Sequence, residues 1–261
     1  MNPYIPKLYE IVGKQWHTSD TCVLKVKAEL PHEPGQFFQV SVLNMGEAPI
    51  SVCSYQQGVI DLNVRDVGTV THAICKLEVG DKVGIRGPYG HGYPMEAMQG
   101  NEIVIIAGGT GFSPVRGVVE YVEQHPEDFK GITMFIGFRD PSNILFKEDI
   151  ERWSKKYNVN LSVDKGDDGW QGKVCFVTKL LEDSGINNKG KIAIACGPPV
   201  MIGFVLKILK KLCWHDDQIY VSLERMMSCG IQKCGNCLVH GKYVCKDGPV
   251  FRYDLAKELV D

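Results

Sequence analysis

The hydrophobic pattern of the chain changes near residue 98. Before that point, short runs in which apolar and polar residues alternate are separated by Gly- and Pro-containing turns, about every 8–12 residues. These runs occupy residues 21–30, 35–43, 48–55, 59–67 and 81–90. Alternation at this short spacing indicates half-buried antiparallel strands. Residues 1–97 are therefore predicted to form a small antiparallel β-barrel.

From residue 98 onward, continuous apolar runs alternate with segments of helical period. Strand-like runs lie at 103–109, 131–138, 159–164, 191–197 and 218–223, and helix-like segments at 145–157, 175–184 and 199–212. This alternation predicts a doubly wound parallel α/β domain over residues 98–223. The pattern stops after Leu223, so residues 224–261 are predicted to form a small third module. The expected fold class is α+β, with several domains.

Composition narrows the range of partners. The chain has 261 residues, a formal net charge of −2 and 44% hydrophobic residues, so nothing points to nucleic acid or an anionic membrane. The first residues lack the apolar core of a signal peptide, and the longest apolar runs are too short to span a bilayer. We therefore expect a cytoplasmic protein, whose ten cysteines are reduced or metal-bound rather than paired in disulfides.

Four of these cysteines gather near the C-terminus at the spacing C-x4-C-x2-C-x7-C. They are Cys229, Cys234, Cys237 and Cys245. The first three follow the rhythm of a [2Fe–2S] loop, and glycines such as Gly230 let the backbone wrap closely around sulfur. A four-thiolate zinc site is the alternative, although structural zinc sites more often use two C-x2-C pairs and only one is present here.

Two turns follow buried strands of the predicted sheet. Residues 108–111 (GGTG) and 196–201 (CGPPVM) each stand where a strand ends and a helix begins. In an open α/β sheet, ligands bind beyond the carboxyl ends of the strands, and the free N–H groups of a helix start attract phosphate. Both turns are therefore predicted to face one nucleotide crevice. The alternative for each is a tight turn without a ligand.

A barrel followed by GGTGFSPV (108–115), GFRDPSNILFKEDI (137–150) and CGPPVM resembles the ferredoxin–NADP reductase superfamily over nearly the whole chain. The resemblance implies that the glycine turn binds the pyrophosphate of a nicotinamide nucleotide. It also implies that the Cys-Gly-Pro turn lies beside the nicotinamide and flavin rings. The residues that it assigns to the nucleotide are Gly109, Thr110, Gly111, Pro114, Cys196, Gly197 and Met201, with Arg139 and Phe146 at further positions near it.

The same resemblance implies FAD on the barrel. The stretch GEAPISVCSY (46–55) is similar to the flavin motif R-P-x-S, but Ala48 stands where the motif has an arginine that holds the FAD pyrophosphate. Arg65 could supply the missing charge from the next strand, and residues 86–94 resemble a loop that closes over the flavin. The residues expected to hold FAD are Pro49, Ile50, Ser51, Arg65, Gly68, Val70 and Thr71.

Together these features predict an electron path. Hydride would pass from the nicotinamide to FAD beside Ser51 and Cys196, the two residues expected to be catalytic. A flavin that releases electrons singly gives a one-electron centre a use that zinc would not have, so the context favours [2Fe–2S]. Asp164, after the third strand of the sheet, suits a ribose 2′-hydroxyl. NADH rather than NADPH is therefore expected, although Lys165 blurs the distinction.

Three stretches resemble the electron-transfer flavoprotein of anaerobic sulfite reductases: residues 46–52 with their alanine, residues 86–94 and the tail 224–251. The resemblance implies two partners, an iron–sulfur subunit and a sirohaem catalytic subunit that reduces sulfite to sulfide. A hydrogenase gamma subunit and the electron-transfer subunit of dihydroorotate dehydrogenase are the alternatives. A diaphorase that works without partners and a zinc-bearing scaffold also stay open.

Overall fold

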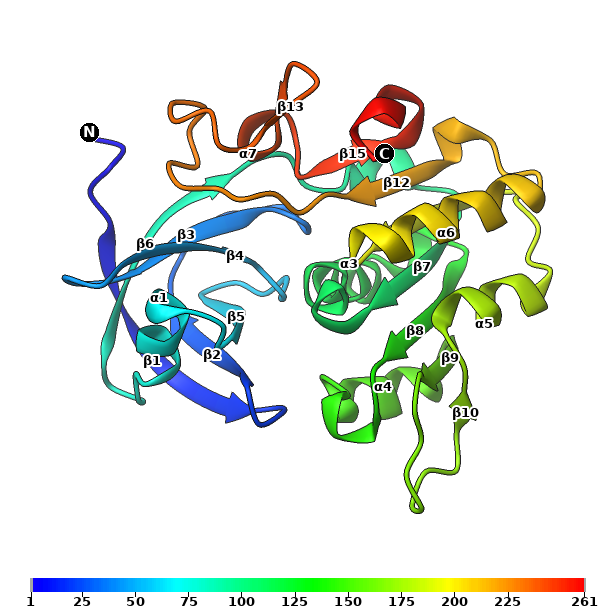
Figure 1. The fold of residues 1–261 in the computed structure, drawn as a ribbon, viewed down its shortest axis with the longest axis horizontal. Helices are drawn as coiled ribbons and strands as arrows, with labels where there is room; N and C mark the ends of the chain where they lie inside the picture. Colours follow the sequence, from blue (N-terminus) through cyan, green and yellow to red (C-terminus); the bar gives the residue numbers. More distant parts are fainter. Residues whose placement is uncertain (1, 261) are drawn as a thin grey trace.

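The computed structural model describes residues 2–260, and its first part is an antiparallel sheet closed into a barrel (Figure 1). Its strands lie in the order β4-β3-β6-β1-β2-β5, and a bridge between Val52 and Leu62 joins the two ends. Inward-facing apolar side chains fill the interior, and α1 (Thr69–Cys75) adds Ile74 to it. The strands are β1 (Lys7–Trp16), β2 (Thr21–Lys27), β3 (Phe37–Val42), β4 (Gly46–Ser51), β5 (Val59–Arg65) and β6 (Lys82–Tyr89).

The second part is a sheet in the order β10-β9-β8-β7-β11-β12-β15, with helices on both faces (Figure 1). The helices α3 (Phe112–Gln124) and α4 (Lys147–Ser154) cover one face, while α5 (Val177–Ser184) and α6 (Pro199–Lys211) cover the other. The order reverses at β7, as in doubly wound folds. The strands are β7 (Glu102–Gly108), β8 (Gly131–Phe138), β9 (Asn158–Val163), β10 (Lys173–Val174), β11 (Lys191–Cys196), β12 (Ile219–Ser222) and β15 (Val250–Arg252).

The C-terminal segment lies across the top of both parts in Figure 1. It holds the short ladder β13 (Leu238–Val239) and β14 (Lys242–Tyr243) and the turn α7 (Val244–Asp247), and β15 then pairs antiparallel with β12 at the edge of the sheet. The predicted fold class is confirmed, whereas the limits at residues 97 and 223 stay predictions. The remaining elements are α2 (Met95–Met98) and the 3-10 turns Gly109–Gly111, Pro126–Asp128, Pro141–Asn143, Asp216–Gln218, Tyr253–Leu255 and Lys257–Leu259.

The lengths of the helices can be compared with the expectation that no segment spans a bilayer. Within residues 2–260, none of them combines the length and the apolar character needed to cross a bilayer.

Candidate redox site

The two turns predicted to face one crevice are in direct contact. They follow β7 and β11, which pair in parallel with Cys196 opposite Ala107. A Cβ added to Gly111 would lie 2.6 Å from the carbonyl oxygen of Cys196 and equally close to the backbone of Gly197. Met201 packs against both Gly108 and Gly197. Only glycine allows the two backbones to approach so closely, which explains the residue type at position 111.

Gly109 and Thr110 form the open side of the same crevice. Gly109 has φ = +56°, and nothing lies within 4 Å of a Cβ built on it. The 3-10 turn that they begin leads directly into α3, whose first turn contains the buried Pro114. Unpaired N–H groups at such a start, together with the helix dipole, favour a bound phosphate. The turn can therefore hold a pyrophosphate without a basic side chain.

Cys196 is buried at the end of β11, with its thiol near Ser222 and Tyr93. Burial raises the pKa of this thiol to about 12, although a hydrogen bond with Ser222 opposes the shift. The side chain is therefore a neutral thiol at physiological pH and cannot act as a nucleophilic thiolate. Its chemistry is limited to packing and weak hydrogen bonding beside a ligand.

Arg139 and Asp164 lie side by side at the ends of β8 and β9. The Lys165 N–H donates to the Arg139 carbonyl at 2.9 Å, and the Asp164 N–H donates to the Phe138 carbonyl at 2.8 Å. Both side chains reach solvent. The carboxyl group of Asp164 is nevertheless partly shielded from water, which raises its pKa. They form a charged rim at the carboxyl edge of the sheet, where a nucleotide ribose would lie in such folds. Phe146, by contrast, is buried and lines a different cavity, described below.

The flavin motif occupies β4, on whose two faces its side chains alternate. Ile50 and Ala48 pack against the barrel interior, so Pro49 and Ser51 point to the outer face. The position that carries arginine in the flavin motif is thus a small residue directed at the core. Arg65, the proposed substitute, is half exposed and forms an ion pair with Asp20 at 2.9 Å.

The second flavin element begins α1 and lies beside the start of β4. Thr71 Oγ1 accepts hydrogen bonds from the N–H groups of Val67 and Gly68, at 3.1 and 3.0 Å, and donates to the Gly68 carbonyl. Val70 packs close to Gly46, the first residue of β4. The structure therefore brings the two flavin elements together, with the Thr71 hydroxyl already engaged in capping the helix.

The cysteine loop is organised around Cys229. Its Sγ accepts backbone N–H bonds from Ile231, Lys233 and Cys234 at 3.4, 3.2 and 3.4 Å. Burial alone would raise the pKa of Cys229, but these bonds outweigh it and lower the pKa to about 7. A ring of N–H donors around sulfur stabilises a thiolate, the form that binds iron or zinc.

The four cysteine side chains lie close enough to influence one another's ionisation. The Cys229 thiol interacts with that of Cys234, and the Cys245 thiol interacts with those of Cys237 and Cys229. Burial raises the pKa of Cys245 to about 12, with the neighbouring Cys237 adding to the shift. Within residues 2–260, no three His, Cys, Asp or Glu side chains converge as ligands of a single ion. Four cysteines gathered in one loop are a ligand set that suits an iron–sulfur cluster.

A buried amide lies beneath this loop. Gln39 on β3 is fully buried, and neither atom of its amide has a hydrogen-bond partner among residues 2–260. A Cβ added to Gly230 (φ = +72°) would lie 3.2 Å from the Gln39 side chain. Unpartnered buried amides are rare in native proteins and indicate a polar group that is not protein. The floor of the cysteine loop therefore also fits a bound inorganic or flavin group.

A buried ion-pair network, which sequence reasoning missed, joins the barrel to the sheet. Arg116 on α3 contacts Asp61 of β5 at 3.3 Å, Glu120 at 2.8 Å and Asp149 of α4 at 2.7 Å. It also donates to the Cys53 carbonyl at 2.6 Å. The one feature of the sequence that pointed to this network was an Arg and a Glu four residues apart on the apolar face of an expected helix. This network fixes the orientation of the two halves between which a flavin and a nucleotide would meet.

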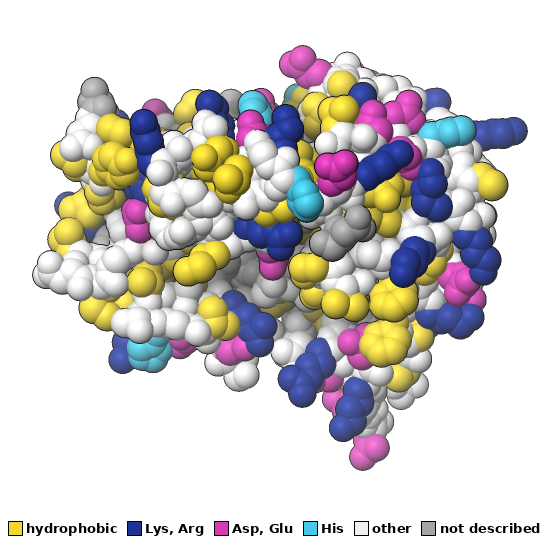
Figure 2. Space-filling view, turned by 45° about the horizontal axis from the view of Figure 1, so that its top comes forward, with side chains coloured by type: hydrophobic (Ala, Val, Ile, Leu, Met, Phe, Trp, Pro, Cys, Tyr) yellow, Lys and Arg dark blue, Asp and Glu magenta, His cyan; other side chains and the backbone are white. Residues whose placement is uncertain are grey.

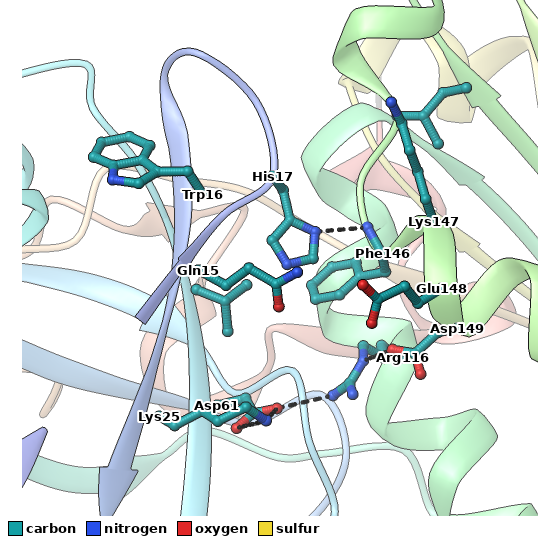
Figure 3. Close-up of a pocket in the computed structure, with 12 residues that line it drawn as sticks. Gln15, Trp16, His17, Lys25, Asp61, Arg116, Phe146, Lys147, Glu148 and Asp149 are labelled. Carbon is teal, nitrogen blue, oxygen red and sulfur yellow. Dashed lines mark hydrogen bonds and ion pairs between the residues drawn. The ribbon is translucent and has the colours of Figure 1, made fainter. Parts of the chain in front are cut away.

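A polar cavity of about 340 Å³ opens beside this network (Figure 3). His17, from the turn between β1 and β2, points at the start of α4, where its Nδ1 accepts the Phe146 N–H at 2.8 Å. Burial and the nearby Arg116 lower the pKa of His17. The imidazole is therefore held neutral, as its acceptor role requires.

Comparison with known proteins agrees with this geometry. The family of the oxidoreductase NAD-binding domain matches residues 105–207, and that of the iron–sulfur cluster binding domain of dihydroorotate dehydrogenase B matches residues 224–256. The chain is 37% identical to the sulfhydrogenase 2 gamma subunit of Pyrococcus furiosus, over 88% of this chain and 86% of the relative. It is 33% identical to a probable dihydroorotate dehydrogenase B electron transfer subunit of Methanopyrus kandleri, over 93% and 88%.

Solved structures support the fold. A structure of NADH-dependent reduced ferredoxin-NADP oxidoreductase matches with a TM-score of 0.79 at 24% identity, over 97% of this chain and 93% of its own. A ferredoxin NADP+ reductase from Neisseria gonorrhoeae, with bound FAD and NADP, matches with a TM-score of 0.72 at 15% identity, over 82% and 97%. The chain belongs to the NAD(P)H-linked electron-transfer subunits with flavin and iron–sulfur modules, within the ferredoxin–NADP reductase superfamily.

Proposed function

We propose that this chain is the electron-input subunit of an anaerobic sulfite reductase. It would take hydride from NADH onto FAD and pass electrons through a [2Fe–2S] cluster to an iron–sulfur subunit and a sirohaem subunit. The observation that carries the redox part is the contact between the Gly111 and Cys196 turns, together with a cysteine loop seated on the flavin side of the barrel. When bound, FAD supplies the chemistry that turns a two-electron hydride into single electrons.

In the crevice, each proposed nucleotide residue has a distinct task. The backbone of the glycine turn would hold the pyrophosphate, while the neutral Cys196 thiol would limit how the nicotinamide packs. Asp164 would accept hydrogen bonds from the ribose hydroxyls and disfavour a 2′-phosphate, which supports NADH over NADPH. The proposed nucleotide residues are Gly109, Thr110, Gly111, Pro114, Arg139, Asp164, Cys196, Gly197 and Met201.

On the barrel, the outward-facing Ser51 hydroxyl would donate to the flavin ring, and Pro49 would shape the surface beside it. The start of α1 would face the FAD pyrophosphate with its backbone N–H groups. Arg65 is free to join them only by leaving Asp20, an exposed pair that costs at most about 1 kcal/mol to break. The proposed FAD residues are Pro49, Ile50, Ser51, Arg65, Gly68, Val70 and Thr71.

The spacing of the cysteines and the flavin context support [2Fe–2S] over zinc. The C-x4-C-x2-C rhythm is that of a [2Fe–2S] loop, and a one-electron centre has a use beside a flavin that zinc would not have. Cys234 and the surrounding loop are exposed, so an electron could leave directly to a partner. Figure 2 shows the face that carries this loop, on which hydrophobic, basic and acidic side chains are interspersed.

Two kinds of partner complex are candidates, a sulfite reductase and a hydrogenase. The three stretches at 46–52, 86–94 and 224–251 favour sulfite reductase, whereas 37% identity to a sulfhydrogenase gamma subunit favours a hydrogenase. Affinity purification of the tagged chain from its anaerobically grown host separates them. Co-purified sirohaem and NADH-dependent sulfide production support the first, and co-purified hydrogenase activity without sirohaem would replace it with the second.

The electron path itself is tested by the visible spectrum of anaerobically purified protein before and after NADH is added. We expect flavin bands on a broader iron–sulfur absorption, both bleached by NADH, with about two irons per chain. A flavin spectrum with bound zinc and no iron would contradict the cluster assignment. Failure of NADH to bleach the flavin would contradict the donor.

A further inference from the structure

The outer face of the barrel under the cysteine loop is built by three neighbouring strands. Gln39 of β3 pairs with Arg86 of β6 on one side and with Pro49 of β4 on the other. The loop rests directly on this face, because a Cβ on Gly230 would meet both Gln39 and Tyr89 within about 3.3 Å. The segment that carries the first cysteine therefore packs beside the strand that carries the flavin motif.

Arg86 joins the two with its side chain. Its Nη2 donates to the carbonyl oxygen of Cys229 at 2.8 Å, and its Nε donates to the Glu47 carboxylate at 2.7 Å, with a second bond from Nη2 to the same carboxylate. Its Nη1 donates to the Tyr89 hydroxyl at 3.0 Å. Glu47 immediately precedes Ala48 on β4. Arg86 is only 6% exposed, so these bonds are largely shielded from water.

We propose that Arg86 is a positioning residue for electron transfer from the flavin to the cluster, an inference that rests on the proposed function above. A planar guanidinium can hold a carboxylate and a carbonyl at the same time, in a fixed geometry that lysine cannot reproduce. It therefore fixes Cys229 relative to the strand that carries Ser51. Its guanidinium also neutralises the Glu47 carboxylate close to a cluster ligand. Without it, that unpaired negative charge would disfavour the reduced, more negative cluster and lower its reduction potential.

Transfer of electrons from the flavin to the cluster can be measured separately from hydride transfer to the flavin. NADH is the reductant, and its hydride carries two electrons and a proton. In the isolated chain one electron passes on to the cluster, the second stays on the flavin, and the proton can be released to solvent. Flavin bleaching by NADH and the later bleaching of the cluster can therefore be followed as two phases after anaerobic mixing. Arg86 acts only between the two centres, so it should affect the second phase.

The test compares Arg86→Gln, Arg86→Lys and Glu47→Gln in the full chain, with FAD and iron contents measured for each. We expect Arg86→Gln to leave the first phase nearly unchanged, to slow the second about tenfold or more, and to shift the cluster potential negatively and alter its EPR signal. Arg86→Lys should recover part of each effect, and Glu47→Gln should slow the second phase less. Arg152→Gln is the matched control, because Arg152 binds Glu123 through two bonds on the far helix α4.

Three results would overturn the assignment. The first is an Arg86→Gln variant whose second phase, potential and EPR signal match the parent protein. The second is equal slowing of both phases, which would indicate a general structural role. The third is an Arg152→Gln control with the same effects. A parent protein that lacks a cluster or is not reduced by NADH would instead refute the proposed function, so the two failures are distinguishable.

Discussion

Replacing Arg116 by methionine should weaken the junction between barrel and sheet. The variant removes the cation shared by Asp61, Glu120 and Asp149, of which the first two are only 2% and 7% exposed. Asp61 keeps a contact with Lys25 at 3.2 Å and Asp149 one with Arg152 at 3.1 Å, whereas within residues 2–260 no other ion pair is found for Glu120. Removing one partner from a buried ion pair costs about 3–5 kcal/mol. For a chain of this size, that corresponds to a fall in melting temperature of roughly 6–20 °C. Burial already raises the pKa of Glu120, so proton uptake by this carboxyl should moderate the loss.

The assay is thermal unfolding at neutral pH, followed by circular dichroism with FAD in excess. Arg152→Gln serves as the control. Arg152 is half exposed and pairs with Glu123 and, at 3.1 Å, with Asp149, which keeps Arg116, so its loss should cost less than about 1 kcal/mol. Arg116→Met combined with Glu120→Leu should recover part of the loss, because it removes one of the stranded carboxylates. An unchanged melting temperature for Arg116→Met, or an equal fall for Arg152→Gln, would refute the reasoning.

Two further predictions follow from the site. Gly111→Ala places a Cβ 2.6 Å from the Cys196 carbonyl, so it should lower the free energy of unfolding by about 1–3 kcal/mol and raise the KM for NADH. The control Gly203→Ala, on an open helix face, should change neither quantity. An unaltered KM in Gly111→Ala would contradict the proposed role of the contact. The lowered pKa of His17 means that the unfolded chain binds its proton first as pH falls. The free energy of unfolding should therefore decrease below about pH 6.5, and urea midpoints should show a flatter pH dependence in His17→Gln; equal slopes would contradict it.

The sequence pattern predicted most elements of the fold, but not all of them and not all of their pairings. Alternation predicted the barrel strands β2 to β6, and continuous apolar runs predicted the buried parallel strands, because both follow from local burial. The first barrel strand, β1 (Lys7–Trp16), was not among the predicted runs. The edge strand β15 has only three residues, Val250–Arg252, and it pairs with β12, from which the whole cysteine loop separates it in the sequence. Three residues carry no readable period, so this return of the C-terminal segment to the sheet could not be predicted.

The residues of the candidate site were likewise predicted from the sequence only in part. The glycine turn and the cysteines were found because their chemistry depends on local spacing, which the chain displays directly. Arg116 was not, because it reaches Asp61 across 55 residues. Arg86 was noted only as the first residue of the 86–94 stretch, and its bond to Cys229, 143 residues away, was not predicted. Only the fold buries each arginine against its carboxylates.

These distant contacts also give a reason for the alanine in the flavin motif. Position 48 faces the barrel core, whereas its neighbour Glu47 faces outward and binds Arg86, which in turn holds the Cys229 carbonyl. The arginine charge near this strand is therefore supplied from β6 and is already committed to the cysteine loop. An arginine at position 48 would instead direct its charge at the apolar interior of the barrel, where burial of an unpaired charge is costly. Ala48 therefore fits a strand that supports the cluster at one end and, on our proposal, the flavin at the other.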